Sequence, residues 1–218
     1  MKQEKISDAV VRRLPVYLRY LNELSLSGVQ TVSSQDLGEK LNLNPAQIRK
    51  DLASFGEFGR KGVGYNAAYL IEKIRQILKL DKTLGVALVG TGNLGRALCN
   101  YNMYTKDNMK IVAVFDADAS KTGTQINHLT VQPMHELKET VDRLGVTIGI
   151  ITVPAWEAQN VADRFAAAGI KGILNFAPAV LKVPPGVRIH YADFTAELLS
   201  LAYYMDDDNR LSEGEVNV

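Results

Sequence analysis

The hydrophobic pattern of this 218-residue chain changes its period near residue 84. Before that point apolar side chains recur every three or four positions, which is the spacing of helices that bury one face. Helices are predicted at residues 8–26, 34–41, 45–55 and 68–80. In the first of them, Pro15 predicts a short first turn, a kink and then a longer helix. After residue 84, short runs rich in Val, Ile and Leu alternate with helical stretches, so the chain reads as two domains of different architecture.

The front domain carries the signals of a helix-turn-helix. A serine can cap the helix at 34–41, and Asn44 caps the next helix with Pro45 at its first position. Two short helices joined by a tight turn form this motif. The stretch that follows has three glycines around Arg60 and Lys61. It predicts a β-hairpin, the wing of a winged-helix domain.

The second helix of the motif has the composition of a recognition helix, with Ile48 and Leu52 facing the core and polar side chains facing outward. Residues 1–80 hold 13 Lys and Arg against 8 Asp and Glu, whereas the rest of the chain holds 12 against 16. The front domain is therefore the one suited to a polyanion. Each cation alone fits an ordinary solvated surface, but together with the helix-turn-helix and the hairpin they favour DNA. The expected DNA-binding residues are Arg13, Gln47, Arg49, Lys50, Ser54, Arg60 and Lys61.

The back domain reads as an α/β fold, a Rossmann doubly wound parallel sheet, because strands and helices alternate along it. Strands are predicted at residues 85–90, 110–116, 146–153, 172–176 and 187–191, with a weaker one at 129–131. Helices are predicted at residues 93–104, 134–144, 155–168 and 195–205. The tail that follows is polar and is expected to fray.

A glycine motif stands where the first of these strands ends and a helix begins. Residues 90–95 read Gly-Thr-Gly-Asn-Leu-Gly and match the G-x-G-x-x-G pattern of dinucleotide-binding folds. Asp116 ends the next strand, where a carboxylate accepts hydrogen bonds from the adenosine ribose and repels a 2′-phosphate, so NADH and NAD⁺ are favoured over NADP(H). The carboxyl ends of later strands should border the same ligand, at Thr152-Val153-Pro154 and at Asn175–Pro178. The expected cofactor-binding residues here are Gly90, Thr91, Gly92, Asn93, Leu94, Gly95, Asp116, Thr152, Val153 and Pro154.

Catalytic and metal chemistry find little support in the composition. No His stands beside a carboxylate in a loop at the strand ends, so the proton donor of a dehydrogenase is missing and no catalytic residue is expected. Three scattered histidines and the single Cys99 form no metal-ligand cluster. A lone cysteine, no membrane-spanning apolar run and no signal-peptide core predict a cytoplasmic protein. The cofactor then acts as a signal instead of a reagent.

Five segments that together span nearly the whole chain carry a further signal: Arg12-Arg13-Leu14-Pro15 with Tyr17, Ile48–Leu52 running into Phe55–Tyr65, Val89–Gly95, Thr152–Ala155 and Ile173–Pro178. In these segments and their order, the sequence resembles the Rex family of redox-sensing transcriptional repressors. The resemblance implies a homodimer on palindromic operator DNA, released when NADH accumulates, with a C-terminal helix exchanged between partners. It also implies that Tyr101 and Phe194 lie at the nicotinamide, and that Arg13, Tyr101 and Asp193 form a switch. The domains are then 1–80 (winged helix), 81–192 (Rossmann), 193–206 (swapped helix) and 207–218 (polar tail).

Two alternatives stay open at this stage. The first is an NAD-dependent oxidoreductase with an unusual N-terminal domain, which the missing catalytic pair disfavours. The second is a winged-helix regulator of another nucleotide ligand, such as a coenzyme A derivative, which Asp116 disfavours. The contacts of the loop at residues 118–123 cannot be assigned from the sequence.

Overall fold

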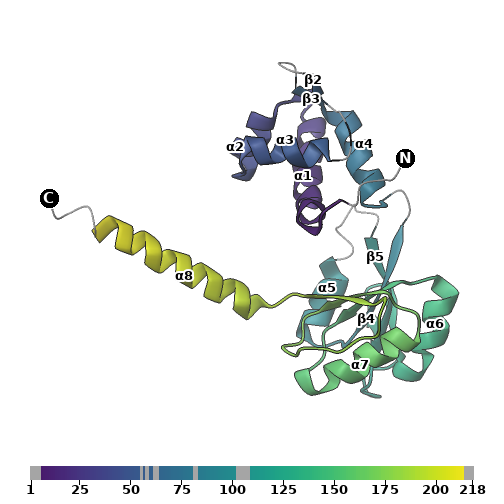
Figure 1. Ribbon diagram of the computed structural model, residues 1–218. Helices are drawn as coiled ribbons and strands as arrows, with labels where there is room; N and C mark the ends of the chain where they lie inside the picture. The colour runs from purple at the N-terminus through teal and green to yellow at the C-terminus, as the bar shows by residue number, and fades with distance from the viewer. Residues whose placement is uncertain are drawn as a thin grey trace. The chain divides into compact units, whose positions relative to one another are not determined.

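The protein divides into two compact units, residues 1–82 and 83–218 (Figure 1). The computed structural model describes residues 6–54, 56, 59–60, 64–80, 83–101 and 109–213, without the side chains of 59–60 and 206–213. The division falls within two residues of the boundary expected after residue 80. No helix in these described ranges is both long enough and apolar enough to cross a membrane.

Four helices form the first unit, and their capping residues explain where they begin. They are α1 (Asp8–Leu26), α2 (Ser34–Leu41), α3 (Pro45–Ala53) and α4 (Ala67–Ile77). Ser33 caps α2 in a reciprocal capping box with Asp36, and Asn44 accepts a hydrogen bond from the Ala46 N–H at the start of α3. The helix-turn-helix prediction is confirmed, although α3 ends two residues before the expected Phe55.

Helix α1 runs without a break through Pro15, so the interruption predicted there is wrong. Proline removes one backbone hydrogen bond, but Pro15 lies on the exposed face of the helix. Its neighbours Leu14, Tyr17 and Leu18 are buried in the core of the unit. Packing of this apolar face holds the helix together, since tertiary contacts supply most of a helix's stability.

A small antiparallel sheet carries the predicted wing. Strand β2 (Gly59–Arg60) pairs with β3 (Gly64–Asn66), and β3 also pairs with β1 (Thr31–Val32). Gly64 has φ of 91°, and a Cβ there would lie 2.7 Å from the carbonyl oxygen of Val32, so the strand crossing admits only glycine. The hairpin prediction is thus confirmed, while Lys61 at its tip lies outside the described residues.

A fully buried carboxylate joins the first helix to the recognition helix. Asp51 on α3 accepts two hydrogen bonds from Arg13 on α1, from Nε at 2.6 Å and from Nη2 at 2.8 Å. It also accepts from the Tyr17 hydroxyl at 2.7 Å and from the Gln47 amide at 2.6 Å. Burial alone would raise the pKa of the Asp51 carboxyl, but the hydrogen bonds from Arg13, Tyr17 and Gln47 outweigh it and hold that pKa below its usual range. No signal in the sequence marked Asp51 for this role.

The second unit is built on a seven-stranded sheet of order β10-β9-β8-β4-β5-β7-β6. All neighbouring pairs are parallel except β6 with β7. The strands are β4 (Leu84–Val89), β5 (Met109–Asp116), β6 (Gln125–Ile126), β7 (Leu129–Pro133), β8 (Ile148–Ile151), β9 (Gly172–Asn175) and β10 (Arg188–Tyr191). Leaving out β6, this is the order of a dinucleotide-binding fold, so the predicted Rossmann sheet is confirmed and β6 is an unexpected addition.

Helices cover both faces of the sheet because apolar residues on β4 alternate between them. Ala87 and Val89 pack with α6 (Leu137–Leu144) and α7 (Ala155–Ala167), while Val86 and Leu88 pack with α5 (Asn93–Tyr101). A short 3₁₀ turn, η1 (Met134–Glu136), precedes α6. The expected continuation of α5 to Tyr104 falls on residues outside the described ranges.

The last helix, α8 (Phe194–Glu213), extends beyond the expected end at Met205, so the start of the tail is helical instead of frayed. Every side chain from Phe194 to Met205 is exposed, although many of them are large and apolar. An exposed run of large apolar side chains like this one is unusual on the surface of a monomeric protein.

Replacing Asp51 by Ala should lower the free energy of unfolding of the first unit by about 3 kcal/mol, because Arg13 and Tyr17 would lose a buried partner. Urea denaturation followed by circular dichroism measures this. Glu72→Ala on the exposed face of α4 is the matched control, with an expected change below about 0.5 kcal/mol. Equal effects of the two substitutions would contradict a special role for Asp51.

The ion pair between Arg13 and Asp51 should also make the stability of the first unit depend on pH. Because the pKa of Asp51 is lowered in the folded state, its contribution is complete above the unfolded pKa of about 4 and is lost as the pH falls through the lower folded value. Stability of the first unit should therefore drop below about pH 4 in the parent protein, and less steeply in Asp51→Ala.

Candidate functional site

The carboxyl ends of three neighbouring strands meet at one edge of the large sheet. Val89 at the end of β4 lies between Phe115 of β5 and Ile151 of β8 in the strand register. The Gly90 N–H donates to the Phe115 carbonyl at 2.8 Å, and the Thr152 N–H donates to the Val89 carbonyl at 3.0 Å. The glycine motif, Asp116 and the segment at 152–154 are thereby brought together as predicted, at the place where such sheets bind ligands.

Two glycines of the motif are required by the protein's own backbone. Gly90 has φ of 101°, and a Cβ there would lie 2.6 Å from the Thr152 carbonyl oxygen. A Cβ on Gly95 would lie 1.9 Å from the Gly90 carbonyl oxygen. Gly92 differs from both, since a Cβ there would meet nothing within 4 Å. Its missing side chain leaves open space outside the loop, where a ligand can approach the backbone.

The amino end of α5 faces the same open space. Gly92, Asn93 and Leu94 are exposed, and the first N–H groups of a helix have no partner within it. Together with the positive end of the helix dipole, these N–H groups can bind a negatively charged group such as a pyrophosphate.

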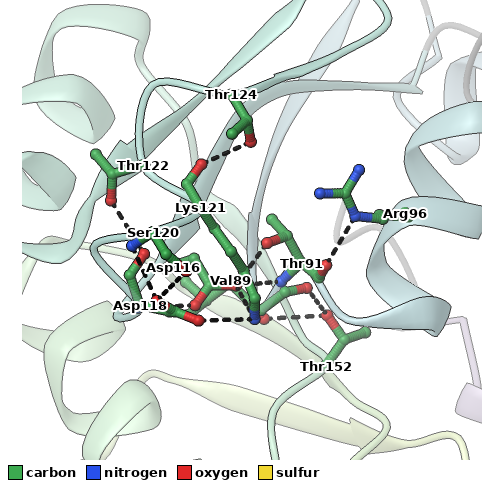
Figure 2. Close-up of polar contacts among 11 residues, drawn as sticks. Val89, Thr91, Arg96, Asp116, Asp118, Ser120, Lys121, Thr122, Thr124 and Thr152 are labelled. Carbon is green, nitrogen blue, oxygen red and sulfur yellow. Dashed lines mark hydrogen bonds and ion pairs between the residues drawn. The ribbon is translucent and has the colours of Figure 1, made fainter.

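Thr91 lies on the inner side of the loop and holds it to the next strand. It is buried, and both its N–H and its hydroxyl donate to the Asp116 carboxylate, at 2.7 and 2.5 Å (Figure 2). Of the motif's residues, Thr91 therefore positions the loop, while Gly92, Asn93 and Leu94 are the ones open to a ligand.

Asp116 is more densely bonded than the sequence suggested. Besides Thr91, the Asp118 N–H donates to its Oδ1 at 3.0 Å, and Lys121 Nζ lies 3.2 Å from its Oδ2. Burial would raise the pKa of Asp116, but the hydrogen bonds from Thr91, Asp118 and Lys121 together hold it below its usual range. The carboxylate is therefore ionised at neutral pH, as an acceptor for ribose hydroxyls must be. Sequence reasoning missed Lys121, since no general pattern marks it.

The later strand ends make different contributions to the site. The Thr152 hydroxyl donates to the carbonyls of Gly90 at 2.7 Å and Val89 at 3.0 Å, so it supports the glycine loop from behind (Figure 2). Val153 is half-buried and Pro154 is exposed, next to the start of α7. Asn175 is buried and its side chain bonds the backbone of Ala177 and Ala179, so it shapes its own loop.

The residues expected at the nicotinamide lie at the ends of helices. Tyr101 is the last residue of α5 and is 66% exposed, and Phe194 is the first residue of α8 and is 74% exposed. Asp193 caps α8, because its Oδ1 accepts from the Thr195 and Ala196 N–H groups at 3.0 and 3.1 Å. Capping was not foreseen for Asp193.

The recognition helix α3 presents its polar side chains as predicted. Ile48 and Leu52 are buried, while Gln47, Arg49, Lys50 and Ser54 are exposed. Three of these side chains have hydrogen-bond partners within the unit. Arg49 donates to the Ser34 hydroxyl at 2.9 Å, Gln47 donates to the Asp51 carboxylate, and the Ser54 hydroxyl donates to the Asp51 carbonyl. Lys50 is exposed and borders the groove between α1 and α3 that Arg13 and Gln47 also line.

Two other residues that were expected to contact DNA, Arg13 and Arg60, lie outside α3. Arg13 donates to Asp51 through two of its five N–H groups, so it stabilises the interior of the domain and still has N–H donors for a contact at the surface. Arg60 lies in β2, where only its backbone is described.

Cys99 is no nucleophile in this arrangement. It is buried between α5 and the sheet, and burial raises the pKa of its thiol to about 11. Within the described ranges, no three His, Cys, Asp or Glu side chains gather in a group that could hold a metal ion.

Known proteins match both units of this chain. The family model described as "Putative DNA-binding protein N-terminus" matches residues 5–53, and the one described as "CoA binding domain" matches residues 81–179. A Redox-sensing transcriptional repressor Rex from Brevibacillus brevis is 58% identical over 204 residues, which cover 94% of this chain and 99% of that protein. The protein of the same name from Anoxybacillus flavithermus is 47% identical over 94% of this chain and 96% of its own.

Solved structures agree with these relatives. The crystal structure of RSP in complex with β-NAD⁺ and operator DNA is 37% identical, with a TM-score of 0.87 over 98% of this chain and all of that one. The structure of RSP described as a Rex-family repressor is 36% identical, with a TM-score of 0.85 over 96% of this chain and 98% of its own. A near-full-length match at 58% identity to a regulator also decides against the oxidoreductase alternative. The chain belongs to the Rex family of redox-sensing transcriptional repressors.

Proposed function

We propose that this protein binds palindromic operator DNA as a homodimer and releases it when NADH occupies the site at the carboxyl edge of the large sheet. The observation that carries the proposal is the similarity to RSP, solved with both β-NAD⁺ and operator DNA, over 98% of this chain. The protein then represses transcription while NADH is scarce and acts in the cytoplasm, where the DNA and the coenzyme are both found.

The sheet edge supports the dinucleotide part of the proposal. The open space beside Gly92 and the amino end of α5 suit the pyrophosphate, and the ionised Asp116 suits the ribose hydroxyls of the adenosine. NADH and NAD⁺ differ only at the nicotinamide, in charge and ring planarity. Discrimination between them therefore belongs to Tyr101, the segment at 152–154 and Phe194, while the glycine loop binds both forms alike.

The apolar surface of α8 supports the homodimer. Its exposed large side chains would be covered if the helix packed against a second copy of the chain. They are Phe194, Leu198, Leu199, Leu201, Tyr203, Tyr204 and Met205. In a dimer, two recognition helices reach successive major grooves only when they sit about 34–36 Å apart.

Linkage then explains the response to NADH. If NADH favours a dimer in which the spacing of the recognition helices is wrong for the operator, DNA and NADH must weaken each other's binding by the same factor. We propose Arg13, Tyr101 and Asp193 as the switch between the two arrangements. Arg13 has N–H donors left after bonding Asp51, so an additional contact with a carboxylate such as Asp193 need not break that pair.

The name of the matching family model, "CoA binding domain", keeps a coenzyme A derivative as the second candidate ligand. Competition by NADH, NAD⁺ and acetyl-coenzyme A for the same site separates the two. Tight binding of acetyl-coenzyme A with weak binding of NADH would replace the redox signal by an acyl signal.

The decisive experiment measures fluorescence polarisation of a labelled palindromic operator while the NADH to NAD⁺ ratio is varied. We expect the complex to dissociate as the ratio rises. Operator binding that stays constant up to saturating NADH would refute the sensor, and absence of operator binding at any ratio would refute the repressor.

Gly92→Val should weaken NADH binding by about 100-fold or more, because the new side chain fills the space needed by the pyrophosphate. The fold should survive, since a side chain at Gly92 meets no protein atom within 4 Å at its Cβ. Calorimetric NADH titration and thermal unfolding measure the two effects. Gly172→Ala, whose Cβ would make only an ordinary 3.5 Å contact with Ile148, serves as the control. Normal NADH release of the operator by Gly92→Val would place the site elsewhere.

Lys50→Ala should weaken operator binding by about 10- to 100-fold and reduce its salt dependence, with NADH affinity unchanged. Arg19→Ala on the exposed side of α1 removes the same charge from the same unit and controls for net charge. Electrophoretic mobility shift at two salt concentrations gives both quantities. If Arg19→Ala weakened binding as much, the effect would be one of overall charge.

Tyr101→Ala should raise the NADH concentration needed for release by about tenfold, the change expected for about 1.4 kcal/mol, while operator affinity without NADH stays the same. The residue is exposed at the end of α5, so its loss leaves no cavity. The operator polarisation titration measures both numbers. An unchanged NADH response would remove Tyr101 from the nicotinamide site.

A further inference from the structure

The loop between β5 and β6 holds a lysine against the carboxylate that ends β5. Lys121 Nζ lies 3.2 Å from Asp116 Oδ2 and 3.8 Å from Asp118 Oδ2, and its side chain is 36% exposed (Figure 2). The neighbouring Asp118 side chain is 47% exposed. The group of two carboxylates and one ammonium thus opens to solvent beside the glycine loop.

Hydrogen bonds within the loop fix the position of Lys121. Its N–H donates to the Asp118 carbonyl at 3.0 Å, and its carbonyl accepts from the Thr124 hydroxyl at 2.6 Å. The loop is tied to β7 in turn, because the Val131 N–H donates to the Thr124 carbonyl and the Gly123 N–H donates to the Val131 carbonyl. The backbone of Lys121 is therefore held in place by hydrogen bonds, and its ammonium is held by the two carboxylates.

Asp116 does not need Lys121 to stay in place. The Thr91 N–H, the Thr91 hydroxyl and the Asp118 N–H all donate to its carboxylate. These three hydrogen bonds come from buried or backbone groups, whereas the ammonium comes from the open side. The role of Lys121 is accordingly electrostatic, acting on whatever lies outside the carboxylate.

We propose that Lys121 sets how strictly this site rejects a phosphate on the adenosine 2′-oxygen, and so how far NADPH can occupy the site of NADH. The inference rests on the proposed dinucleotide site. A 2′-phosphate on a ribose bonded to Asp116 would lie close to the Asp116 carboxylate, beside Asp118. The Lys121 ammonium, which contacts both carboxylates, cancels one of these two negative charges. A ribose with a free hydroxyl carries no charge and responds far less to the ammonium.

The test compares NADH and NADPH binding by calorimetry in the full-length parent protein and in Lys121→Gln. NADPH affinity should fall by about fivefold, the size expected of a partly exposed charge contact, while NADH affinity changes by less than about twofold. Lys121→Arg, which keeps the positive charge, should restore NADPH binding. Lys138→Gln removes an exposed ammonium paired with Asp142 elsewhere in the same unit, and should leave the ratio of the two affinities unchanged.

The outcomes separate this inference from the proposed function. Equal changes for both coenzymes in Lys121→Gln, no change for either, or tighter NADPH binding would each overturn the role of Lys121. So would a parent protein that binds NADH without measurable binding of NADPH. A parent protein that binds neither coenzyme would instead overturn the proposed dinucleotide site itself.

Discussion

The hydrogen bonds from Thr91 to the buried carboxylate of Asp116 are the contact on which the ligand site depends. They tie the glycine loop at the end of β4 to the end of β5, and Thr152 ties the same loop to the end of β8. With its inner side fixed in this way, the loop can leave Gly92 and the first turn of α5 open. A site whose donors are already in place loses less entropy when a ligand binds.

In the DNA-binding unit, too, a buried carboxylate holds neighbouring elements together. Asp51 is an ionised carboxylate with no exposed surface, and it gathers donors from α1 and from α3 itself. A buried charge is tolerated only when it is fully bonded, so the relative placement of these two helices is strongly constrained. The recognition helix is thereby presented as a rigid surface, and its exposed Lys50 and Arg49 are placed by the core behind them.

Function in this family requires that two such rigid parts influence each other. In the proposed homodimer, neither the glycine loop nor the recognition helix needs to change internally for this to happen, since a change in their arrangement is enough. The coenzyme's chemistry then matters only as a difference in binding energy between two arrangements. This explains how a dinucleotide-binding fold acts as a sensor.

Local sequence determined most of the architecture. Period and capping residues located the helices, and the glycine motif with Asp116 located the candidate ligand site, because these signals depend on neighbours along the chain. The continuity of α1 through Pro15, the burial of Asp51 against Arg13 and the placement of Lys121 on Asp116 were decided only by tertiary structure. An ion pair between residues 38 positions apart, such as Arg13 with Asp51, leaves no periodic trace in the sequence. Lys121 is only five positions from Asp116, but the shape of the loop that brings them together is fixed by its hydrogen bonds to β7.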